Sequence, residues 1–438
     1  MIIMKFGGTS VGNAERIRNT AEIVKSNAKK HPVVVVSAVA KMTDALIRLA
    51  NECSEGKGAA TLEYIKKTHY GIIGQLELSN ALLERDMDEL ENLASKSKNK
   101  RLNSRVLDCF QSFGERMSSK IVAAQLNKIG VKSQAFDSWD LGFLTDSEFG
   151  NAEPLEASHA RIKNSIRKLD AVPVITGFIG KTENGEITTL GRGGSDYTAA
   201  IIGAAVDADE IQIWTDVDGI MSTDPKIVGN AIALDNVSFA EASELAYFGA
   251  KVLHPKTILP AMDKDIPVRV LNSFNPKNKG TTILKKAGKN HRAVKAIACK
   301  KNVTRINVDS KRMLGAYGFL ARLFDVFAEH KRSVDVVSTS EVSVSLTIDG
   351  NGDLEPILGE LRDIANIDIA KNKAIICVVG ESMRRTPGIA GLTFSTLGKS
   401  GINVEMISQG ASQINITFIV DGKDAEKAVK VLHKEYFG

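Results

Sequence analysis

The chain has 438 residues, too many for one ordinary domain, and its length predicts two or three domains. Apolar residues make up 43% and charged residues 25%, the balance of a globular protein with a sizeable core. The net charge of +5 is spread among acidic residues and only 5% of residues are aromatic, which argues against nucleic acid as the main partner.

Cysteine usage and hydropathy predict a cytoplasmic protein with free thiols and no membrane partner. The four cysteines form no CxxC pair, so no zinc or redox motif is visible and no metal site is expected on the protein itself. No apolar run approaches the roughly 20 residues of a membrane helix. Lys5 and the Gly7-Gly8 pair interrupt any early apolar segment, so we expect no signal peptide.

The first 40 residues predict a strand, a helix and a second strand. Ile2 to Phe6 has the apolar character of a buried strand, and Asn13 to about Lys29 carries a helical pattern. Pro32 then precedes VVVVSAV, a continuous β-branched run typical of parallel sheets. Together these segments form a βαβ unit.

The next 240 residues continue this alternation. Residues 58–130 are expected to be mainly helical, and Asn184-Gly185 is a hairpin turn signal. Further strands are expected at Val172–Ile179, Glu210–Trp214 and Val268–Leu271. The alternation predicts an α/β domain with a mainly parallel sheet, ending near the polar stretch that begins at Asn275.

The remainder contains an internal repeat. GFLARLFDVFAEHK from Gly318 matches the pattern of GIAGLTFSTLGKSG from Gly388. SVDVVS from Ser333 aligns at the same offset with NVEMIS from Asn403, and a further strand follows each. Two tandem α+β modules are expected, of a kind that often binds a small effector.

KFGGTSVG, from Lys5 to Gly12, lies where the first strand passes to the first helix. Backbone amides exposed by glycine near a helix N-terminus can bind an anion, and Lys5 adds positive charge. Asn13-Ala14 replaces the Lys-[Ser/Thr] of a P-loop, so the segment is not a Walker motif. A plain strand-to-helix turn is the alternative.

TTLGRGGSDYTAA places an arginine between glycines ahead of a helix. Arg192 could bind a carboxylate or phosphate in a bidentate way, and Asp196 could orient Lys5 or a metal. The alternative is an N-cap formed by Ser195 or Asp196, with Arg192 solvated.

Other polar groups follow predicted strands or lie on helices, and each has a duller interpretation. Thr215 and Asp216 could form an ordinary turn, Ser37 and Thr43 could cap a helix, and Glu115 could be a surface charge. No nucleophile–base pair is present. Hydroxyl, glycine, basic and acidic groups gathered at strand ends suit phosphoryl transfer, in which the protein positions groups and neutralises charge.

The motifs KFGGTSVG, SAVAKMT, FGER, TLGRGGSDYTAA, WTDVDGI and GAKVLHP, in this order, resemble those of the aspartate kinase family over essentially the whole chain. The resemblance implies an amino-acid kinase fold over residues 1–285. It also implies a linker and first ACT module over 286–372, and a second ACT module over 373–438 that could share a strand from 293–308.

The resemblance further implies transfer of the γ-phosphate of ATP to the side-chain carboxylate of L-aspartate, the first step of lysine, threonine and methionine biosynthesis. Mg²⁺ would bridge the nucleotide phosphates. By matched position, the catalytic residues would be Lys5, Gly7, Gly8 and Asp196. The aspartate site would comprise Ser37, Thr43, Glu115, Arg192 and Ser195. Lys5 and Gly8 would also contact the nucleotide, together with Thr215, Asp216, Met221, Lys226 and Lys251. Met221 and Lys226 stand where Tyr and Arg are more frequent in the family that the chain resembles.

MLGAYGFLARLF and SVDVVSTSEVSVSLTID resemble the lysine-sensitive members of the family. The implied effector contacts are Met313, Phe319, Leu320, Ser333, Val334, Asp335, Ser340 and Glu341. The two acids would suit a cationic effector such as lysine better than threonine. ACT modules usually pair across chains, which implies a homodimer or a dimer of dimers. Another amino-acid kinase and a non-catalytic amino-acid sensor are the alternatives.

Overall fold

The computed structural model describes residues 1–248, 255–286, 292–314, 317–350 and 352–438. They form two compact units. The first comprises residues 1–220, 235–239 and 252–287, and the second comprises 221–234, 240–251 and 288–438. Among the described residues, no helix combines the length and the apolar character needed to cross a membrane.

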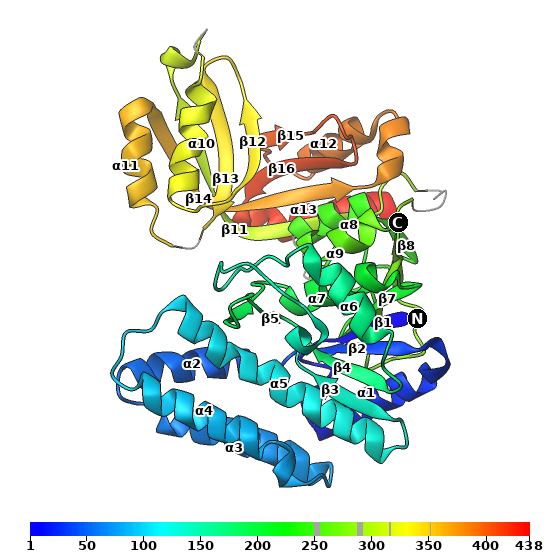
Figure 1. Cartoon of the computed structure of the whole chain (residues 1–438). Helices are drawn as coiled ribbons and strands as arrows, with labels where there is room; N and C mark the ends of the chain where they lie inside the picture. The colour runs from blue at the N-terminus through cyan, green and yellow to red at the C-terminus, as the bar shows by residue number, and fades with distance from the viewer. Residues whose placement is uncertain (249–254, 287–291, 315–316, 351) are drawn as a thin grey trace. The chain divides into compact units, whose positions relative to one another are not determined.

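The first unit is built on an eight-stranded, mainly parallel sheet, as the sequence predicts (Figure 1). Only the contact of β9 with β10 is antiparallel among its ladders. In spatial order the strands are β3 (Ser133–Phe136), β4 (Val172–Thr176), β2 (Pro32–Val36), β1 (Ile2–Phe6), β7 (Glu210–Thr215), β9 (Val268–Asn272), β10 (Thr281–Leu284) and β8 (Asn236–Ser238). A separate hairpin, β5 (Ile179–Lys181) with β6 (Ile187–Thr189), encloses the expected Asn184-Gly185 turn.

Helices cover both faces of this sheet, which explains its continuous apolar strands. One face carries α1 (Ala14–Ser26) and α5 (Ser104–Lys128), and the other carries α7 (Gly194–Val206) with α6 (Ala157–Ile166) and α9 (Pro255–Asp263) beside it (Figure 1). The outer side of α5 packs against α2 (Met42–Ser54) and α4 (Glu84–Ser97), and α3 (Ala59–Gln75) packs on α2. Short 3₁₀ turns lie at Ala28–Lys30, Asn80–Leu82 and Ser138–Leu141.

Alternation along β1 decides which side chain meets which helix. Met4 and Phe6 pack into the core that contains Ile17 and Val24 of α1, while Ile3 lies against Gly203 of α7. Because successive strand residues face opposite sides, Lys5 falls on the face covered by α7.

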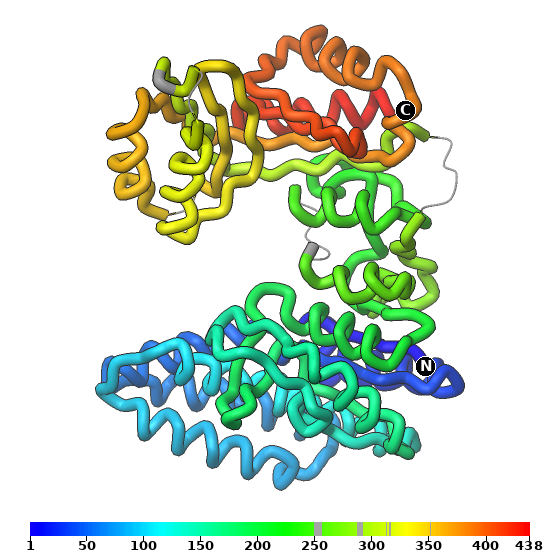
Figure 2. Tube along the Cα trace, turned by 45° about the horizontal axis from the view of Figure 1, so that its top comes forward, coloured from blue at the N-terminus to red at the C-terminus, as the bar shows by residue number. Residues whose placement is uncertain are grey.

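The second unit contains a six-stranded antiparallel sheet built from two modules (Figure 2). Each module has an apolar core of its own. The strand order is β12 (Val334–Thr339), β13 (Ser343–Asp349), β11 (Ala296–Asp309), β14 (Asn366–Val379), β16 (Asn415–Asp421) and β15 (Met406–Ser408). The helices are α10 (Phe319–Glu329), α11 (Glu355–Ile364), α12 (Ile389–Lys399) and α13 (Ala425–Phe437), with 3₁₀ turns at Lys311–Met313, Glu381–Arg385 and Gly422–Asp424. Each module therefore runs strand, helix, strand, strand, helix.

Two features of the second unit go beyond the repeat. The long strands β11 and β14 pair along their whole length, so the start of β11 lies beside the end of β14 in the second module. Most of α8 (Phe239–Tyr247) clusters with this unit. Glu241 on α8 accepts a hydrogen bond from the amide of Glu381 (2.8 Å), and Glu244 accepts one from Asn415 (2.5 Å).

Gly114 gives a direct test of how closely α5 packs against the β2–α2 loop. A Cβ at Gly114 would lie 2.7 Å from Ala38 Cβ, whereas one at exposed Gly71 of α3 would meet nothing within 4 Å. Alanine is favoured over glycine in helices by about 1 kcal/mol. We therefore expect Gly71→Ala to raise the thermal midpoint and Gly114→Ala to lower it. A rise of equal size in both variants would contradict the close packing.

Candidate active site

A cavity of 370 Å³ opens at the carboxyl ends of β1 and β2 in the first unit. Ligands bind at this edge in open α/β sheets. Eight predicted site residues line it: Lys5, Gly8, Ser37, Thr43, Glu115, Arg192, Ser195 and Asp196. Segments separated by more than 180 residues thus meet around one space. The structure also places Gly7 beside the cavity, because a Cβ on it would lie 3.6 Å from Lys5 Nζ.

Lys5 and Asp196 form an ion pair on one wall of the cavity. Lys5 Nζ lies 2.5 Å from Asp196 Oδ1, and both side chains are largely buried. Asp196 is in the first turn of α7, the helix that covers the face of the sheet from which Lys5 projects. The carboxylate therefore fixes the ammonium next to the Gly7-Gly8 turn, where it can face an anion.

The glycine turn before α7 shows that one of our expectations was wrong. Gly193, with φ of +73°, is the N-cap of α7, and no side chain caps the helix. Neither Ser195 nor Asp196 is the N-cap, because both already lie in the first helical turn. Arg192 is exposed at the mouth of the cavity, and its side chain remains available to an anionic ligand.

Glu115 is buried, contrary to its interpretation as a surface charge. It is 3% exposed, and its Oε2 atom has no hydrogen-bond partner. Burial raises the pKa of Glu115 to about 8, and the Ala38 amide and the positive charge of Lys5 oppose this shift only in part. A buried carboxyl without a cation is a ready partner for an ammonium group brought by a ligand.

Several residues of this site gave no clear signal in the sequence. Phe178 and Lys41 line the cavity with φ of +66° and +65°, a left-handed conformation that is strained for side chains of this kind. Asp108, 1% exposed on α5, accepts hydrogen bonds from the amides of Gly150 and Thr189 and from the Thr189 hydroxyl, each at 2.9 Å. It thereby holds the end of β6 just before the turn that carries Arg192.

The predicted nucleotide residues fall into three groups. Thr215 ends β7, which neighbours β1, and Asp216 follows it. The Gly7 amide donates to the Trp214 carbonyl (3.1 Å), so Thr215 lies beside the Gly7-Gly8 turn. Neither Thr215 nor Asp216 lines the cavity. Met221 and Lys226 belong to the second unit. Lys251 lies outside the described residues.

The predicted effector residues gather along β12 and the start of α10, but not around one point. Val334 and Asp335 begin β12, whereas Ser340 and Glu341 follow its far end, about 16 Å away at 3.3 Å per extended residue. Ser333 precedes the strand, Phe319 is 4% exposed in the core of the first module, and Met313 packs against that core. Leu320 is exposed on α10. A single small ligand cannot touch both ends of β12 in one module.

Asp335 already has a cation. Lys300 Nζ on β11 lies 2.9 and 2.8 Å from its two carboxylate oxygens and 2.9 Å from Asp349. The hydroxyl of Tyr247, at the end of α8, donates to Asp335 Oδ1 at 3.1 Å. The Asp335 side chain is 5% exposed, so another ammonium could reach it only if Lys300 moved.

Comparison with known proteins identifies first the class and then the family. A model described as the amino acid kinase family matches residues 1–272, and one described as an ACT domain matches residues 376–436. The chain is therefore an amino-acid kinase with a C-terminal ACT domain.

The chain is 38% identical to the lysine-sensitive aspartokinase 3 of Escherichia coli, over 100% of this chain and 99% of that one. It is 42% identical to the chloroplastic aspartokinase 1 of Arabidopsis thaliana, over 99% of this chain and 80% of the relative. The crystal structure of E. coli aspartokinase III in complex with aspartate and ADP superposes with a TM-score of 0.88 at 36% identity, covering both chains fully. This chain belongs to the aspartokinase family.

Proposed function

We propose that this protein transfers the γ-phosphate of ATP to the side-chain carboxylate of L-aspartate, giving 4-phospho-L-aspartate. The observation that carries the proposal is the cavity in which the Lys5–Asp196 pair meets the buried Glu115 and the exposed Arg192. An acceptor with an ammonium and two carboxylates fits this distribution of charge. The E. coli relative solved with aspartate and ADP supports the same assignment.

Each group has a defined task in this reaction. Glu115 binds the ammonium of aspartate, and Arg192 binds its α-carboxylate, which leaves the side-chain carboxylate directed to Lys5. Ser37, Thr43 and Ser195 supply hydroxyl groups to the same pocket. Lys5, together with the Gly8 amide, neutralises the charge that develops on the transferring phosphoryl group, while the Gly7 amide donates to the Trp214 carbonyl. The family role of this enzyme is the first step toward lysine, threonine and methionine, and we place it in the cytoplasm.

Mg²⁺ fits this site as an ion carried by the nucleotide. The described residues contain no group of three His, Cys, Asp or Glu side chains that could hold a metal. Mg²⁺ keeps waters and phosphate oxygens as ligands and needs few from protein. Bound in this way, it would offset phosphate charge, while Lys5 and the Gly8 amide hold the phosphoryl oxygens and Thr215 and Asp216 contact the nucleotide.

The direct test is ATP-dependent acyl phosphate formation, trapped with hydroxylamine, on aspartate and on glutamate. We expect turnover with aspartate only. Lys5→Met should lower kcat by at least about 100-fold, because it removes the cation facing the phosphoryl group. Unchanged thermal midpoints would show that the variant is folded. Glutamate turnover would reassign the acceptor, and a fully active Lys5→Met variant would contradict the role of Lys5.

The raised pKa of Glu115 predicts how aspartate binding depends on pH. With a pKa of about 8, the carboxyl of the free enzyme is mostly protonated at pH 6–7, yet it must be ionised to pair with an ammonium. The kcat/KM for aspartate should therefore rise by up to about tenfold per pH unit between pH 6 and 8 and then level off. Glu115→Gln should flatten this limb. A wild-type profile that is flat over the same range would refute the burial effect.

We further infer that lysine inhibits the enzyme at the first module. Asp335 and Glu341 supply carboxylates for a cationic amino acid, whereas threonine would need only hydroxyl partners. Within one module, Asp335 and Ser340 lie at opposite ends of β12. One effector could contact both residues only if a second copy of the chain supplied one of them. β12 is the last strand on its side of the sheet, and its Val337 carbonyl accepts a hydrogen bond from the Ser408 hydroxyl of β15. A second copy would therefore have to supply its contacts at the ends of β12, and we propose a homodimer or a dimer of dimers on this ground.

Lys300 provides a test of the effector site. If an effector ammonium must compete with Lys300 for Asp335, Lys300→Met should lower the lysine concentration needed for half-inhibition. Asp335→Asn should abolish lysine inhibition. Steady-state rates over a lysine titration, with threonine in parallel, measure both effects. Half-inhibition unchanged or weakened in Lys300→Met would contradict the competition, whereas wild-type activity insensitive to millimolar lysine would contradict lysine regulation itself.

A further inference from the structure

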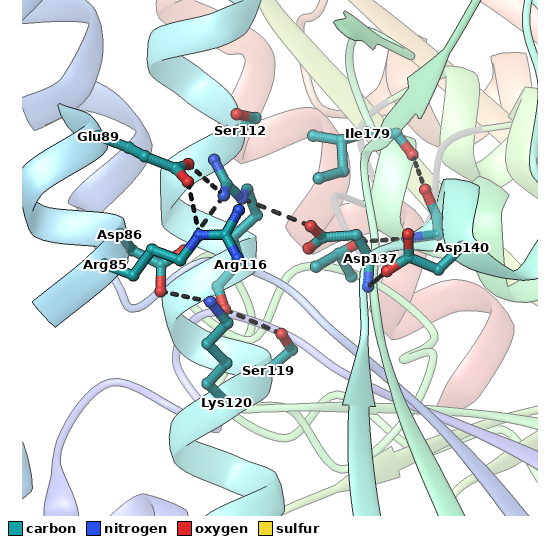
Figure 3. Close-up of polar contacts among 12 residues, drawn as sticks. Arg85, Asp86, Glu89, Ser112, Arg116, Ser119, Lys120, Asp137, Asp140 and Ile179 are labelled. Atoms are coloured by element: carbon teal, nitrogen blue, oxygen red, sulfur yellow. Dashed lines mark hydrogen bonds and ion pairs between the residues drawn. The ribbon is translucent and has the colours of Figure 1, made fainter. Parts of the chain in front are cut away.

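Arg116 follows Glu115 on α5, but it belongs to a separate buried cluster of charges (Figure 3). Consecutive helix residues point about 100° apart, so the two side chains leave α5 in different directions. Glu115 enters the cavity, whereas the guanidinium of Arg116 lies among three carboxylates of other elements.

The three carboxylates come from two sides of α5. Arg116 Nη2 lies 2.7 Å from Glu89 Oε2 and 3.3 Å from Asp86 Oδ1, both on α4. Arg116 Nε lies 3.5 Å from Asp137 Oδ2, directly after β3. The guanidinium also lies 4.7 Å from the centre of the Phe113 ring. One side chain thus ties α5 to a helix and to the edge strand of the catalytic sheet.

Burial makes these contacts restrictive. Asp86 is fully buried and also pairs with Lys120 at 2.5 Å, while the Arg116 side chain is 12% exposed. Buried charges that lose a partner are strongly penalised, so the helix cannot slide or rotate without breaking the cluster. Apolar burial is not directional, so these ion pairs add an orientation to the close packing of α5.

We propose that Arg116 is a positioning residue for substrate binding, which holds Glu115 in place for the ammonium of the acceptor by fixing α5 to α4 and β3. The proposal rests on the proposed aspartate kinase activity. Glu115 stands one residue from the tether, and Gly114 brings the same turn of α5 against Ala38 of the cavity wall. A misplacement of about 1 Å at such a group can reduce activity on the order of 100-fold.

Asp137 makes the tether sensitive to acid. Burial raises the pKa of Asp137 to about 6, and Arg116 opposes the shift. The other charged groups that act on it are Asp140, Lys120 and Asp86. As the pH falls through 6, Asp137 takes up a proton and the β3 side of the tether loses its charge, while Asp86 and Glu89 still hold Arg116. In the wild type, kcat/KM for aspartate should therefore fall more steeply with decreasing pH below pH 6 than above it. In Asp137→Asn this change of slope should be absent.

Arg116→Met, Arg116→Lys and Lys120→Met separate positioning from general stability. Lys120 shares Asp86 with Arg116 but forms no ion pair with Asp137, so Lys120→Met is the matched control. We expect Arg116→Met to raise the aspartate KM by about 10- to 100-fold while the ATP KM changes less than about twofold. Arg116→Lys should recover part of the loss, and Lys120→Met should leave the aspartate KM within about twofold of wild type. Thermal denaturation monitors folding of each variant.

A double variant tests whether Arg116 acts through Glu115. In a Glu115→Gln background, Arg116→Met should add little further loss of kcat/KM for aspartate. Multiplicative losses, or an equal rise in the ATP KM, would overturn the proposal. If Arg116→Met fails to fold, Arg116→Lys and the acid limb of Asp137→Asn decide the question. Wild-type enzyme inactive on aspartate would refute the proposed function, whereas active wild type with an unaffected Arg116→Met variant would refute this inference alone.

Discussion

The ion pair between Lys5 and Asp196 is the contact on which the catalytic unit depends. It joins the first strand of the chain to the helix that begins nearly 190 residues later, and it forms at the edge of the sheet where β1 ends and α7 begins. The alternation of β1 decides that Lys5 faces α7 and not α1. An ammonium held in this way has one fixed position, and the Gly8 amide of the adjoining turn can then reach the same anion.

Helix α5 is the second constraint, because it carries three buried charged groups along one element. Asp108 fixes the end of β6, Glu115 enters the cavity, and Arg116 ties the helix to α4 and β3. Asp108 accepts three hydrogen bonds and Arg116 pairs with carboxylates, whereas the Glu115 Oε2 atom has no hydrogen-bond partner and burial raises the pKa of this carboxyl. Asp108 and Arg116 therefore have structural tasks, and the carboxyl that faces the cavity is the one suited to a ligand.

Much of this could be predicted from the sequence, and the exceptions have physical reasons. The strand Ile2–Phe6 and the run after Pro32 were recognisable because buried parallel strands are continuously apolar. The repeat gave the order of elements in both modules, since the pattern of each helix and strand recurs. Asp108, Arg116 and the strained Phe178 were missed because their partners are distant in sequence. A helix pattern alone cannot tell a buried charge from an exposed one. The N-cap of α7 was misassigned because a glycine with positive φ replaced the expected side-chain cap.

A buried carboxylate is stabilised by a cation in the second unit as well, but there the cation belongs to the chain itself. Asp335 is satisfied within the chain by Lys300, and it also accepts a hydrogen bond from Tyr247 at the end of α8. Glu241 and Glu244 of α8 also accept hydrogen bonds from this unit, so the helix that carries Tyr247 is held at three positions. Asp335 can pair either with Lys300 or with the ammonium of a ligand. The ligand shifts the protein between these two conformations only if it binds one of them more tightly than the other. Glu115 and Asp335 thus differ in one respect. Glu115 has no paired cation among the described residues and can bind an incoming ammonium directly, whereas Asp335 can bind one only if the ammonium displaces Lys300.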